Sequence, residues 1–525
     1  MYIFVSKYKI TKMRKTLLLM LIINATFSMA QDVKITWGPD YKKDGGMFTM
    51  LRYGGHTDKA YYVVEQSAKN TKLFFFDFNH NQLGEQEIEY KYGKSDLRLE
   101  DIYTTKSGNY FLLTGADKKE DKAIITYTTP TKSNTLNTNF TKILEYPYSI
   151  KTPFGFMGFT FNSNFDSDID GAFMSYDSTK IMYMYSQGLQ DAKSVNQKIS
   201  YLVMDDKMKV LFKVNKTLSY PDKKFDLIDN SILNNGDAYF AARHYENDKD
   251  RKTPNYKFHI IKITPASVFK DILIKLDDAA PLSGSVVEME NGNVMVVGSY
   301  TNISNNKSLR ANGTYSVIIN TEGTILSNNI YPFSGEVKEE LFGENEKKAN
   351  KGAMAFKAKK IMFDRTTKAV TICFEKDYIT TTTTTTSSGT RTTTYYHTDD
   401  IIVARFDQNG KRDFESVIDK KFTFANTNHF NSFSFCEYNS NYYFLFNDAK
   451  SISERKEAEV SGRIITDLVK MDKNGKILLR KTLFGNKDID MLFAPKLSDH
   501  LWNNEVLIHG SFKKQYKYGT LFLPE

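Results

Sequence analysis

A strand-turn-strand unit recurs along this chain, and no other feature restricts its fold as much. The clearest copy is SVVEMENGNVMVVGSY (residues 285–300), which is followed by TYSVIINTEGTILSNNIY (residues 314–331). Apolar runs broken by Gly, Asn and Asp predict β-strands joined by tight turns. The two segments together predict one four-stranded meander.

The meander recurs at a fixed interval. Its first turn reappears from Asp58 to Asn503 about every 64 residues, and its second turn from Asn81 to Asn474 about every 65 residues. The hairpins FDQNGK (residues 406–411) and MDKNGK (residues 471–476) are equivalent second turns in adjacent units. A chain of 525 residues exceeds the usual size of one core, so repetition of one unit accounts for its length.

A repeated four-stranded meander is typical of a β-propeller, because one meander cannot bury both of its faces alone. We predict an all-β propeller of about eight four-stranded blades in a single domain (residues 31–525), with seven blades as the alternative. The last unit supplies only three strands, and DVKITWG (residues 32–38) is a lone strand near the start. Pairing of this strand into the last blade would close the ring and remove two open edges. A pair of β-sandwiches is the competing fold.

Two segments interrupt the repeat. We expect a solvated helical insertion at EVKEELFGENEKKANKGAMAFKAKK (residues 336–360), between the fifth and sixth units. The Thr-rich segment TTTTTTTSSGTRTTTYYH (residues 380–397) predicts a projecting β-hairpin, since Thr is β-branched and Ser-Ser-Gly favours a turn. Such a hairpin either engages a partner edge to edge or is a low-complexity expansion whose hydroxyls face water.

The first thirty residues predict a signal peptide. A basic stretch (residues 12–15) precedes a short apolar run (residues 17–23) and a small-x-small cleavage site (residues 28–30). That apolar run is too short to span a bilayer. We expect the true start at Met13 and an exported protein, in the periplasm, the cell envelope or outside the cell, with no transmembrane segment in the mature chain.

The net charge of the mature chain argues against nucleic acid as a partner. The net charge of +9 includes five basic and no acidic residues within residues 1–30, so the mature chain carries only +4. A charge this small over so long a chain does not indicate nucleic-acid binding.

Cys373 and Cys436 lie in apolar runs, and we expect two buried free thiols rather than a bridge. We expect a monomer.

The segment SMAQD at the predicted cleavage site, together with FDQNGK and MDKNGK, resembles the sequences of uncharacterised secreted β-propeller proteins of Bacteroidota-type bacteria. The resemblance covers the whole mature chain. It implies a secreted propeller, and its motifs are too generic to assign a role to any residue.

Connections between second and third strands are long in at least five units, for example residues 187–197, 246–255, 302–313 and 451–462. In a meander these connections emerge on one side, and first-to-second turns emerge on the other. Long loops on one rim of a rigid scaffold typically form a binding surface, with neutral drift in length as the alternative. We therefore predict an exported, non-catalytic propeller that binds a protein or surface-glycan partner through this long-loop face.

Two other functions stay open. One is a propeller hydrolase or lyase acting on polysaccharide, because propellers assemble carboxylates from distant parts of the chain. The other is a structural envelope protein stabilised by calcium. The sequence has no G-x-S-x-G elbow and no phosphate-binding glycine loop, so we name no catalytic or cofactor-binding residue. His244, at a predicted strand end, is a candidate for facing the central channel, although an isolated histidine at a strand end is usually structural.

The motif DSDIDGAFMSYD (residues 166–177) is the one segment with metal-binding spacing. Asp166, Asp168 and Asp170 alternate before a glycine, and Asp177 stands at position 12. Calcium takes six to eight hard oxygen ligands, which this spacing can begin to supply. The motif departs from the helix-loop-helix pattern, because Ile169 stands at position 4 and strands flank it. It is either a calcium loop or an acidic turn between the second and third blades, and calcium is the one cofactor we expect.

Overall fold

The computed structural model describes residues 33–42, 50–57, 59–66, 71–93, 95–117, 122–131, 135–147, 173–185, 196–247, 250–303, 309–343, 352–354, 356–387, 389–449, 464–512 and 515–524. The expected signal peptide (residues 1–30) lies outside the described residues. So does the loop at residues 451–462 and most of the loop at residues 187–197.

The described strands form eight antiparallel sheets of four or more strands, and each is built mainly from one stretch of the chain. Sheets 1 and 2 contain β3 (Met50–His56), β4 (Tyr61–Gln66), β5 (Thr71–Phe76) and β6 (Gln82–Glu87), then β9 (Arg98–Thr105), β10 (Gly108–Asp117), β11 (Lys122–Thr128) and β12 (Thr141–Pro147). Sheets 3 and 4 contain β13 (Phe173–Met174), β14 (Lys180–Met184), β15 (Asn196–Asp205) and β16 (Val210–Pro221), then β17 (Phe225–Ile232), β18 (Ala238–Tyr245), β19 (Tyr256–Ile263) and β20 (Phe269–Ile274).

The second half of the chain repeats the pattern. Sheet 5 contains β21 (Ala279–Pro281), β22 (Ser285–Glu288), β23 (Val294–Asn302), β25 (Gly313–Ile319) and β26 (Ile325–Pro332), and sheet 6 contains β28 (Phe356–Asp364), β29 (Ala369–Thr386), β30 (Gly389–Phe406) and β31 (Arg412–Ala425). Sheet 7 contains β32 (Phe433–Tyr438), β33 (Asn441–Ala449), β34 (Ile464–Asp472) and β35 (Ile477–Gly485), and sheet 8 contains β36 (Leu492–Phe493), β37 (Asp499–Trp502), β38 (Glu505–Phe512) and β39 (Gln515–Phe522) with β1 (Lys34–Trp37) and β2 (Tyr41–Lys42).

A few short elements complete the described chain. They are the pairs β7 (Lys91–Tyr92) with β8 (Ser95–Asp96) and β24 (Arg310–Ala311) with β27 (Ala353–Met354), the helix α2 (Gly335–Phe342), and the 3-10 turns η1 (Asp222–Lys224) and η2 (Pro495–Leu497).

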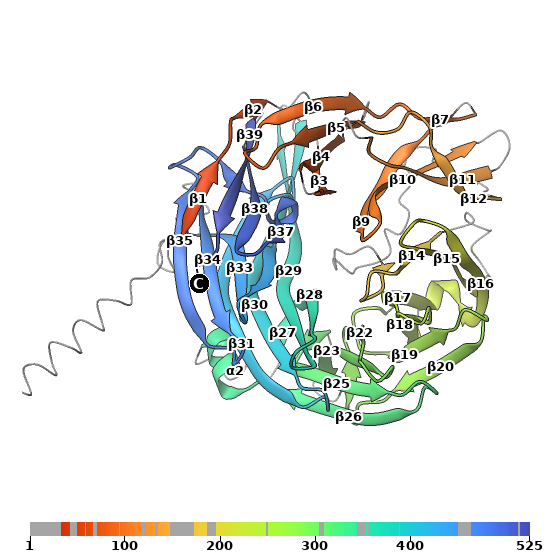
Figure 1. Cartoon of the computed structure of the whole chain (residues 1–525). Helices are drawn as coiled ribbons and strands as arrows, with labels where there is room; N and C mark the ends of the chain where they lie inside the picture. Colours follow the sequence, from red (N-terminus) through yellow and green to blue (C-terminus); the bar gives the residue numbers. More distant parts are fainter. Residues whose placement is uncertain are drawn as a thin grey trace, which may run out of the picture.

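The sheets follow one another around a common centre, with first strands such as β9, β17 and β28 on the inside and last strands such as β16, β26 and β35 on the outside (Figure 1). Within one strand, alternate residues enter different cores. Val294 and Val296 of β23 pack toward sheet 4, whereas Met295 and Val297 pack toward sheet 6. Both faces of the sheet are covered, which explains why such strands are apolar at successive positions.

Buried hydrophobic clusters lie between every two consecutive sheets in the described part of the chain, and one of them joins sheet 8 to sheet 1. In that last cluster Tyr61 and Phe76 of sheet 1 pack with Leu507 and Tyr518 of sheet 8. This radial packing makes the chain a β-propeller and excludes a pair of β-sandwiches. The predicted fold class is confirmed, and the count of eight blades stays a prediction.

The first described strand closes the ring. β1 pairs antiparallel with β39, with Lys34 opposite Phe522 and Trp37 opposite Gly519. The pairing continues one residue further, where the Gly38 N–H donates to the carbonyl oxygen of Tyr518 at 2.9 Å. The predicted closure by the N-terminal strand is therefore confirmed. It gives β39 a neighbour on the side that would otherwise be an open edge.

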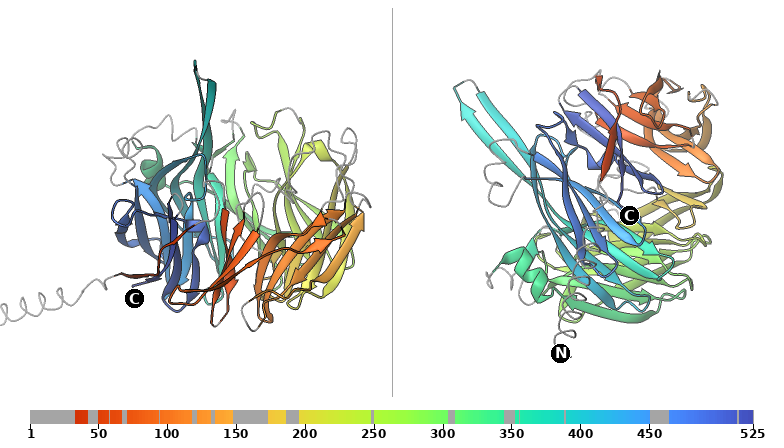
Figure 2. Two further views of the ribbon diagram at one scale, coloured as in Figure 1. Left: turned by 90° about the horizontal axis from the view of Figure 1, so that it is seen from above. Right: turned by 60° about the vertical axis from the view of Figure 1, so that its left-hand side comes forward.

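The meander order separates two sides of the ring. We call the side with the first-to-second and third-to-fourth turns the short-turn side, and the side with the second-to-third connections the long-loop side. On the long-loop side, β29 and β30 extend well past the rest of the ring as a two-stranded projection (Figure 2).

Three details differ from or refine the expectations. Helix α2 covers only Gly335–Phe342, and residues 356–360 belong to β28, where their cross-strand pairing with β29 outweighs the helical propensity of Ala and Lys. Cys373 and Cys436 are both free, and Cys436 is only partly buried. No helix in the described ranges has both the length and the apolar character that crossing a bilayer requires.

Candidate binding face

The projection is a continuation of sheet 6. Beyond the body of the sheet, β29 and β30 remain paired from Tyr378 opposite His397 to Thr386 opposite Gly389. We call residues 380–394 the arm. Thr380–Thr386 are all exposed, and a run of β-branched residues with Gly389 at a φ of 130° favours this strand-turn-strand conformation.

Hydroxyl groups cover both faces of the arm. One face carries only Thr, in the cross-strand pairs Thr381–Thr394, Thr383–Thr392 and Thr385–Thr390. The hydroxyl oxygens of the last two pairs lie 3.4 and 3.5 Å apart. The opposite face carries one cation, Arg391, opposite Thr384. The arm thus offers polar, almost uncharged contact groups.

The root of the arm is an aromatic and hydrogen-bonded cluster across three strands. The rings of Tyr378 and His397 stack with centroids 4.4 Å apart. His397 Nε2 lies 2.7 Å from the Thr380 hydroxyl, and Nδ1 lies 2.9 Å from the hydroxyl of Thr423 on β31. These contacts tie both strands of the arm to the last strand of sheet 6.

Ion pairs lie directly beneath this root. Lys376 Nζ and Asp399 Oδ2 are 2.8 Å apart, and Lys359 Nζ and Asp377 Oδ2 are 2.7 Å apart. The side chains of Lys359 and Asp399 are almost fully buried. Irregularities in strand register fall at the same level, between Glu375 and Asp377. Charges that would point to solvent in a regular strand are thereby turned inward, where they must pair.

One pair at this level is completely buried. Lys420 of β31 donates to a carboxylate oxygen of Glu375 on β29, and neither side chain is exposed to solvent. Lys420 also stands 5.9 Å from the ring centroid of Phe446 on β33, so the pair lies against sheet 7. Burial raises the pKa of the neighbouring Asp400 to about 6, although the Lys420 backbone N–H hydrogen-bonded to it lowers that pKa. The root of the arm thus contains buried, paired charges.

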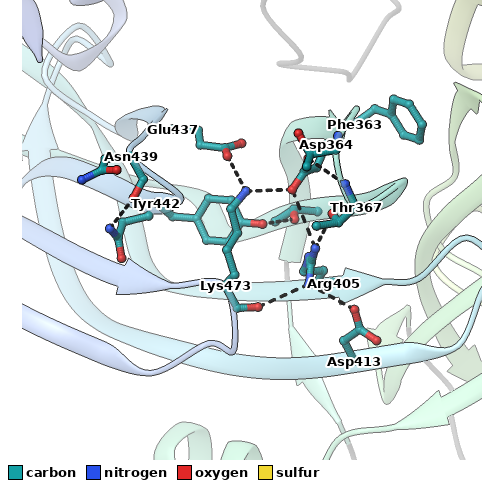
Figure 3. A network of polar contacts seen from close by, with 12 residues as sticks. Phe363, Asp364, Thr367, Arg405, Asp413, Glu437, Asn439, Tyr442 and Lys473 are labelled. Carbon is teal, nitrogen blue, oxygen red and sulfur yellow. Dashed lines mark hydrogen bonds and ion pairs between the residues drawn. The ribbon is translucent and has the colours of Figure 1, made fainter. Parts of the chain in front are cut away.

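The structure places a second charged network on the short-turn side, between sheets 6 and 7 (Figure 3). Arg405 donates to the Thr367 hydroxyl at 2.6 Å and pairs with Asp413 at 3.3 Å. Asp364 lies 3.8 Å from the same guanidinium. Burial opposes ionisation of Asp364, but hydrogen bonds from Thr367 and the nearby Lys473 lower its pKa to about 2.

Lys473, in the third-to-fourth turn of sheet 7, completes this network. Its ammonium group pairs with Asp364 at 3.1 Å and with Glu437 at 2.5 Å, and it stands 4.5 Å from the ring centroid of Tyr442. A contact like that of Arg405 joins sheets 4 and 5, where Lys262 pairs with Asp237 of its own sheet at 2.7 Å and donates to the Thr321 carbonyl of sheet 5 at 2.8 Å. Because a basic side chain bridges neighbouring sheets at both places and the charges of this network pair with one another, we assign the network to ring packing rather than to ligand binding.

His244 does not face the centre of the ring. It lies on β18, the second strand of sheet 4, and its ring stands 4.7 Å from that of Tyr220 at the end of β16. His259 is 6.3 Å away and is bonded to Asp271 at 2.8 Å. His244 therefore packs against sheet 3, as the structural alternative expected, because the alternation of β18 turns this side chain toward that sheet.

Of the expected calcium ligands, only Asp177 lies within the described residues. Its carboxylate accepts hydrogen bonds from the Ser175 hydroxyl at 2.7 Å and from the Thr179 N–H and hydroxyl at 3.0 and 2.8 Å, as a turn cap does. Although burial opposes it, these bonds hold the pKa of Asp177 below its usual value. Asp166, Asp168 and Asp170 lie outside the described residues, so the calcium loop stays a prediction. In the rest of the described chain, no group of three or more acidic, His or Cys side chains is arranged to hold a metal ion.

Sequence reasoning found the arm but missed the ion pairs at its root. Glu375, Lys376, Asp399 and Lys420 lie in EKD (residues 375–377), TDD (residues 398–400) and DKK (residues 419–421). Clusters of charged residues inside long strand-like runs were the sequence signal for these ion pairs. A strand that is buried on both faces cannot leave a charge unpaired without a large energetic cost.

The fold and this face define a closed β-propeller that carries a polar arm on its long-loop side. No family model matches the chain, and no curated protein matches it. The chain is similar to several solved structures at low identity. The β-propeller domain of the Trilobed protease from Pyrococcus furiosus has 9% identity and a TM-score of 0.35, covering 84% of this chain and 97% of that one.

Two further structures show comparable similarity. Polysaccharide lyase Uly1 has 9% identity and a TM-score of 0.34, covering 92% of this chain and 100% of that one. A protein of unknown function from Bacteroides caccae has 11% identity and a TM-score of 0.25, covering 68% of this chain and 93% of that one. At these scores the similarities carry no argument about what this chain does.

Proposed function

We propose that this protein is an exported, non-catalytic β-propeller that binds a protein or surface-glycan partner through its long-loop side, with the arm as the element that reaches the partner. The observation that carries the proposal is the extension of sheet 6 into solvent on a root of buried ion pairs. Ordering so many exposed Thr residues costs conformational entropy, and the root supplies the rigid support that offsets this cost.

The chemistry at the root supports binding rather than catalysis. Lys376, Lys359 and Lys420 each pair with a carboxylate, and these pairs fix the position of the strands. A general acid or base needs access to a substrate atom, whereas Lys420 and its partner are fully buried. Hydroxyl-covered strands offer hydrogen-bond donors and acceptors without the desolvation cost of charged groups.

A polysaccharide hydrolase or lyase is the alternative, and Asp229 on the inner strand β17 is the carboxyl group that favours it most. Burial raises the pKa of Asp229 to about 7, while hydrogen bonds from Ser285 and the Asn230 backbone lower it, so a substantial fraction of the carboxyl group stays protonated near neutral pH, as a general acid requires. Its side chain is nevertheless almost completely buried, and its carboxylate accepts from the Asn230 N–H at 2.8 Å. This placement favours a structural role for Asp229.

The proposal is tested by shortening the arm. In the test variant, residues 381–394 are replaced by Asn-Gly, which joins the cross-strand neighbours Thr380 and Tyr395 through a two-residue turn. Wild type and variant are screened against immobilised purified polysaccharides and a random-peptide display library. A matched control carries Gln408→Ser and Lys411→Ser, two exposed positions in a turn on the short-turn side.

We expect the arm-shortened protein to lose at least about tenfold in affinity for the ligands selected by wild type, and the control to keep its affinity. Both variants should keep a thermal midpoint close to that of wild type, since most of the changed residues are exposed and, among those described, only Thr393 and Thr394 are partly buried. Equal binding by wild type and the arm-shortened protein, or selective loss in the control, would contradict the proposal. Depolymerisation of a polysaccharide by wild type that Asp229→Asn abolishes would favour the enzyme.

A further inference from the structure

One edge of the arm has no partner strand among the described residues. In the described chain, β28 pairs with β29 as far as Phe356 opposite Lys376, and no described strand pairs with that side of β29 from Ile379 to Thr385. In an antiparallel strand, alternate residues direct their N–H and C=O groups to each side. Half of the backbone groups from Ile379 to Thr385 therefore point to the side on which no described strand lies, which we call the open edge.

The other edge of the arm is better covered. β31 pairs with β30 as far as Ala425 opposite Tyr395. The Asn426 N–H then donates to the Thr394 carbonyl at 2.7 Å, and the Thr394 N–H donates to the Asn426 side chain at 3.3 Å. Among the described residues, only the short stretch of β30 near the turn lacks a neighbour on this edge, and this stretch contains Arg391. The edge of β29 is thus the long, accessible one.

The open edge of β29 lacks the features that usually prevent strand addition. Natural edge strands are kept apart by Lys, Pro, bulges or short length. From Ile379 to Thr386, β29 has one Ile, seven Thr, no charge, no Pro and no Gly. Ile379 is also 59% exposed, which is high for a large apolar side chain at the base of an open edge. A strand with this edge adds another strand readily.

We propose that the open edge of β29 pairs antiparallel with the same edge of a second copy of this chain, so that two arms form one four-stranded ribbon. The inference rests on the proposed function, because it takes the arm to be a binding element. An uncharged strand meets its own copy without like-charge repulsion, and cross-strand pairs of β-branched residues are favourable. This association replaces the expectation of a monomer drawn from the sequence.

The geometry also decides how two copies would be arranged. Antiparallel pairing directs the two arms in opposite directions, so the two rings stand at opposite ends of the ribbon and do not collide. A contact made by two strands buries well below the roughly 1,000 Å² typical of stable complexes. Dimers should therefore form reversibly and depend on concentration.

Sedimentation velocity over a range of protein concentrations tests the inference. The test variant carries Thr382→Lys and Thr384→Lys on β29, which brings like charges together when two β29 edges pair. The matched control carries Thr390→Lys and Thr392→Lys, which adds the same charge on β30, away from the shared edge. All these positions are exposed, so we expect equal thermal midpoints.

We expect wild type and the β30 control to associate, and the β29 variant to associate at least about tenfold more weakly, a difference of about 1.4 kcal/mol. Wild type that stays monomeric at every concentration, or equal weakening in both variants, would overturn the inference. Monomeric wild type that still loses its ligand on arm shortening would leave the proposed function intact. Conversely, dimerisation of wild type with unchanged ligand binding after arm shortening would support this inference and contradict the proposed function.

Discussion

Tyr378 and His397 face each other across β29 and β30, and their rings are almost parallel, inclined by 6°. The pair stands where the two strands leave the ring. Lys376 Nζ lies 5.5 Å from the centroid of the Tyr378 ring, which connects the stack to the ion pair with Asp399 below it. The stack therefore joins the buried part of sheet 6 to the arm, and the order of the arm should depend on it.

Replacing His397 by Ala should loosen the arm while leaving the ring folded. The change removes the stacked ring and the contacts to Thr380 and Thr423, which together stabilise the root by about 1 kcal/mol. We expect faster proteolytic cleavage within residues 380–394, with a thermal midpoint close to wild type. Thr392→Ala, further along the arm, is the control and should cleave at the wild-type rate. Equal cleavage of all three proteins would contradict the assigned role of His397.

Because β1 closes the ring against β39, replacing Gly519 on β39 should destabilise the protein more than replacing Gly84 on β6. A Cβ at Gly519 on β39 would lie 2.8 Å from Trp37 Cε3 and 2.9 Å from the Thr36 carbonyl oxygen, so Gly519→Ala should force β1 away. We expect a loss of about 1 to 3 kcal/mol in the free energy of unfolding, measured in urea. At Gly84 on β6 a Cβ would meet only Phe75, at 3.9 Å, so Gly84→Ala should cost much less. Equal effects would mean that β1 does not pack as described.

The buried ion pair of Lys420 and Glu375 predicts that replacing the two residues has strongly non-additive effects on the free energy of unfolding. Lys420→Met alone leaves a carboxylate in an apolar site and should cost about 3 to 5 kcal/mol in the free energy of unfolding. The double variant Lys420→Met, Glu375→Leu removes both charges and should lie within about 2 kcal/mol of wild type. Urea unfolding of the two single variants and the double variant measures this. Additive losses would show that the two groups are not coupled.

Asp229 predicts a loss of stability as the pH rises. Burial raises the pKa of its carboxyl group to about 7 in the folded protein, from the ordinary value of 3.8, although hydrogen bonds from Ser285 and the Asn230 N–H lower it. The unfolded chain therefore releases this proton first, and the stabilising contribution present below about pH 4 is lost as the pH rises to about 7.

Asp229→Asn removes the titration. We expect the difference in free energy of unfolding between this variant and wild type to shift in favour of the variant by about 1 to 3 kcal/mol from pH 5 to pH 8. Urea midpoints at the two pH values measure the shift. A difference that is independent of pH would show that Asp229 is already ionised in the folded protein at pH 5.

The repeat could be predicted from sequence because its turns are local. A turn such as Asp407–Lys411 is fixed by its own residues: the Asp407 carboxylate accepts from the Asn409 and Lys411 N–H groups at 2.8 Å. Turns of this kind recur at a constant interval, so the sheets and their order follow. The pairing of β1 with β39 was also predictable, because the last unit supplies only three strands and a lone strand stands at residues 32–38.

The charged root of the arm could not be predicted because it depends on register. Glu375 and Lys420 are 45 residues apart, and they meet only after strand irregularities at Glu375–Asp377 and at Asp399–Ile401. A shift of one residue in a strand exchanges its two faces, so alternation alone could not say which charges point inward. The neighbours of His244 could not be predicted for the same reason, because the face of β18 to which His244 belongs depends on strand register.

Amide hydrogen exchange with residue resolution tests most directly whether the Thr-rich segment is an ordered pair of strands continuous with sheet 6. In dilute protein, β29 should show alternate protection from Thr380 to Thr386, because only every second amide donates to β30. Exchange of every amide in this segment at the rate of an unstructured peptide would contradict the account.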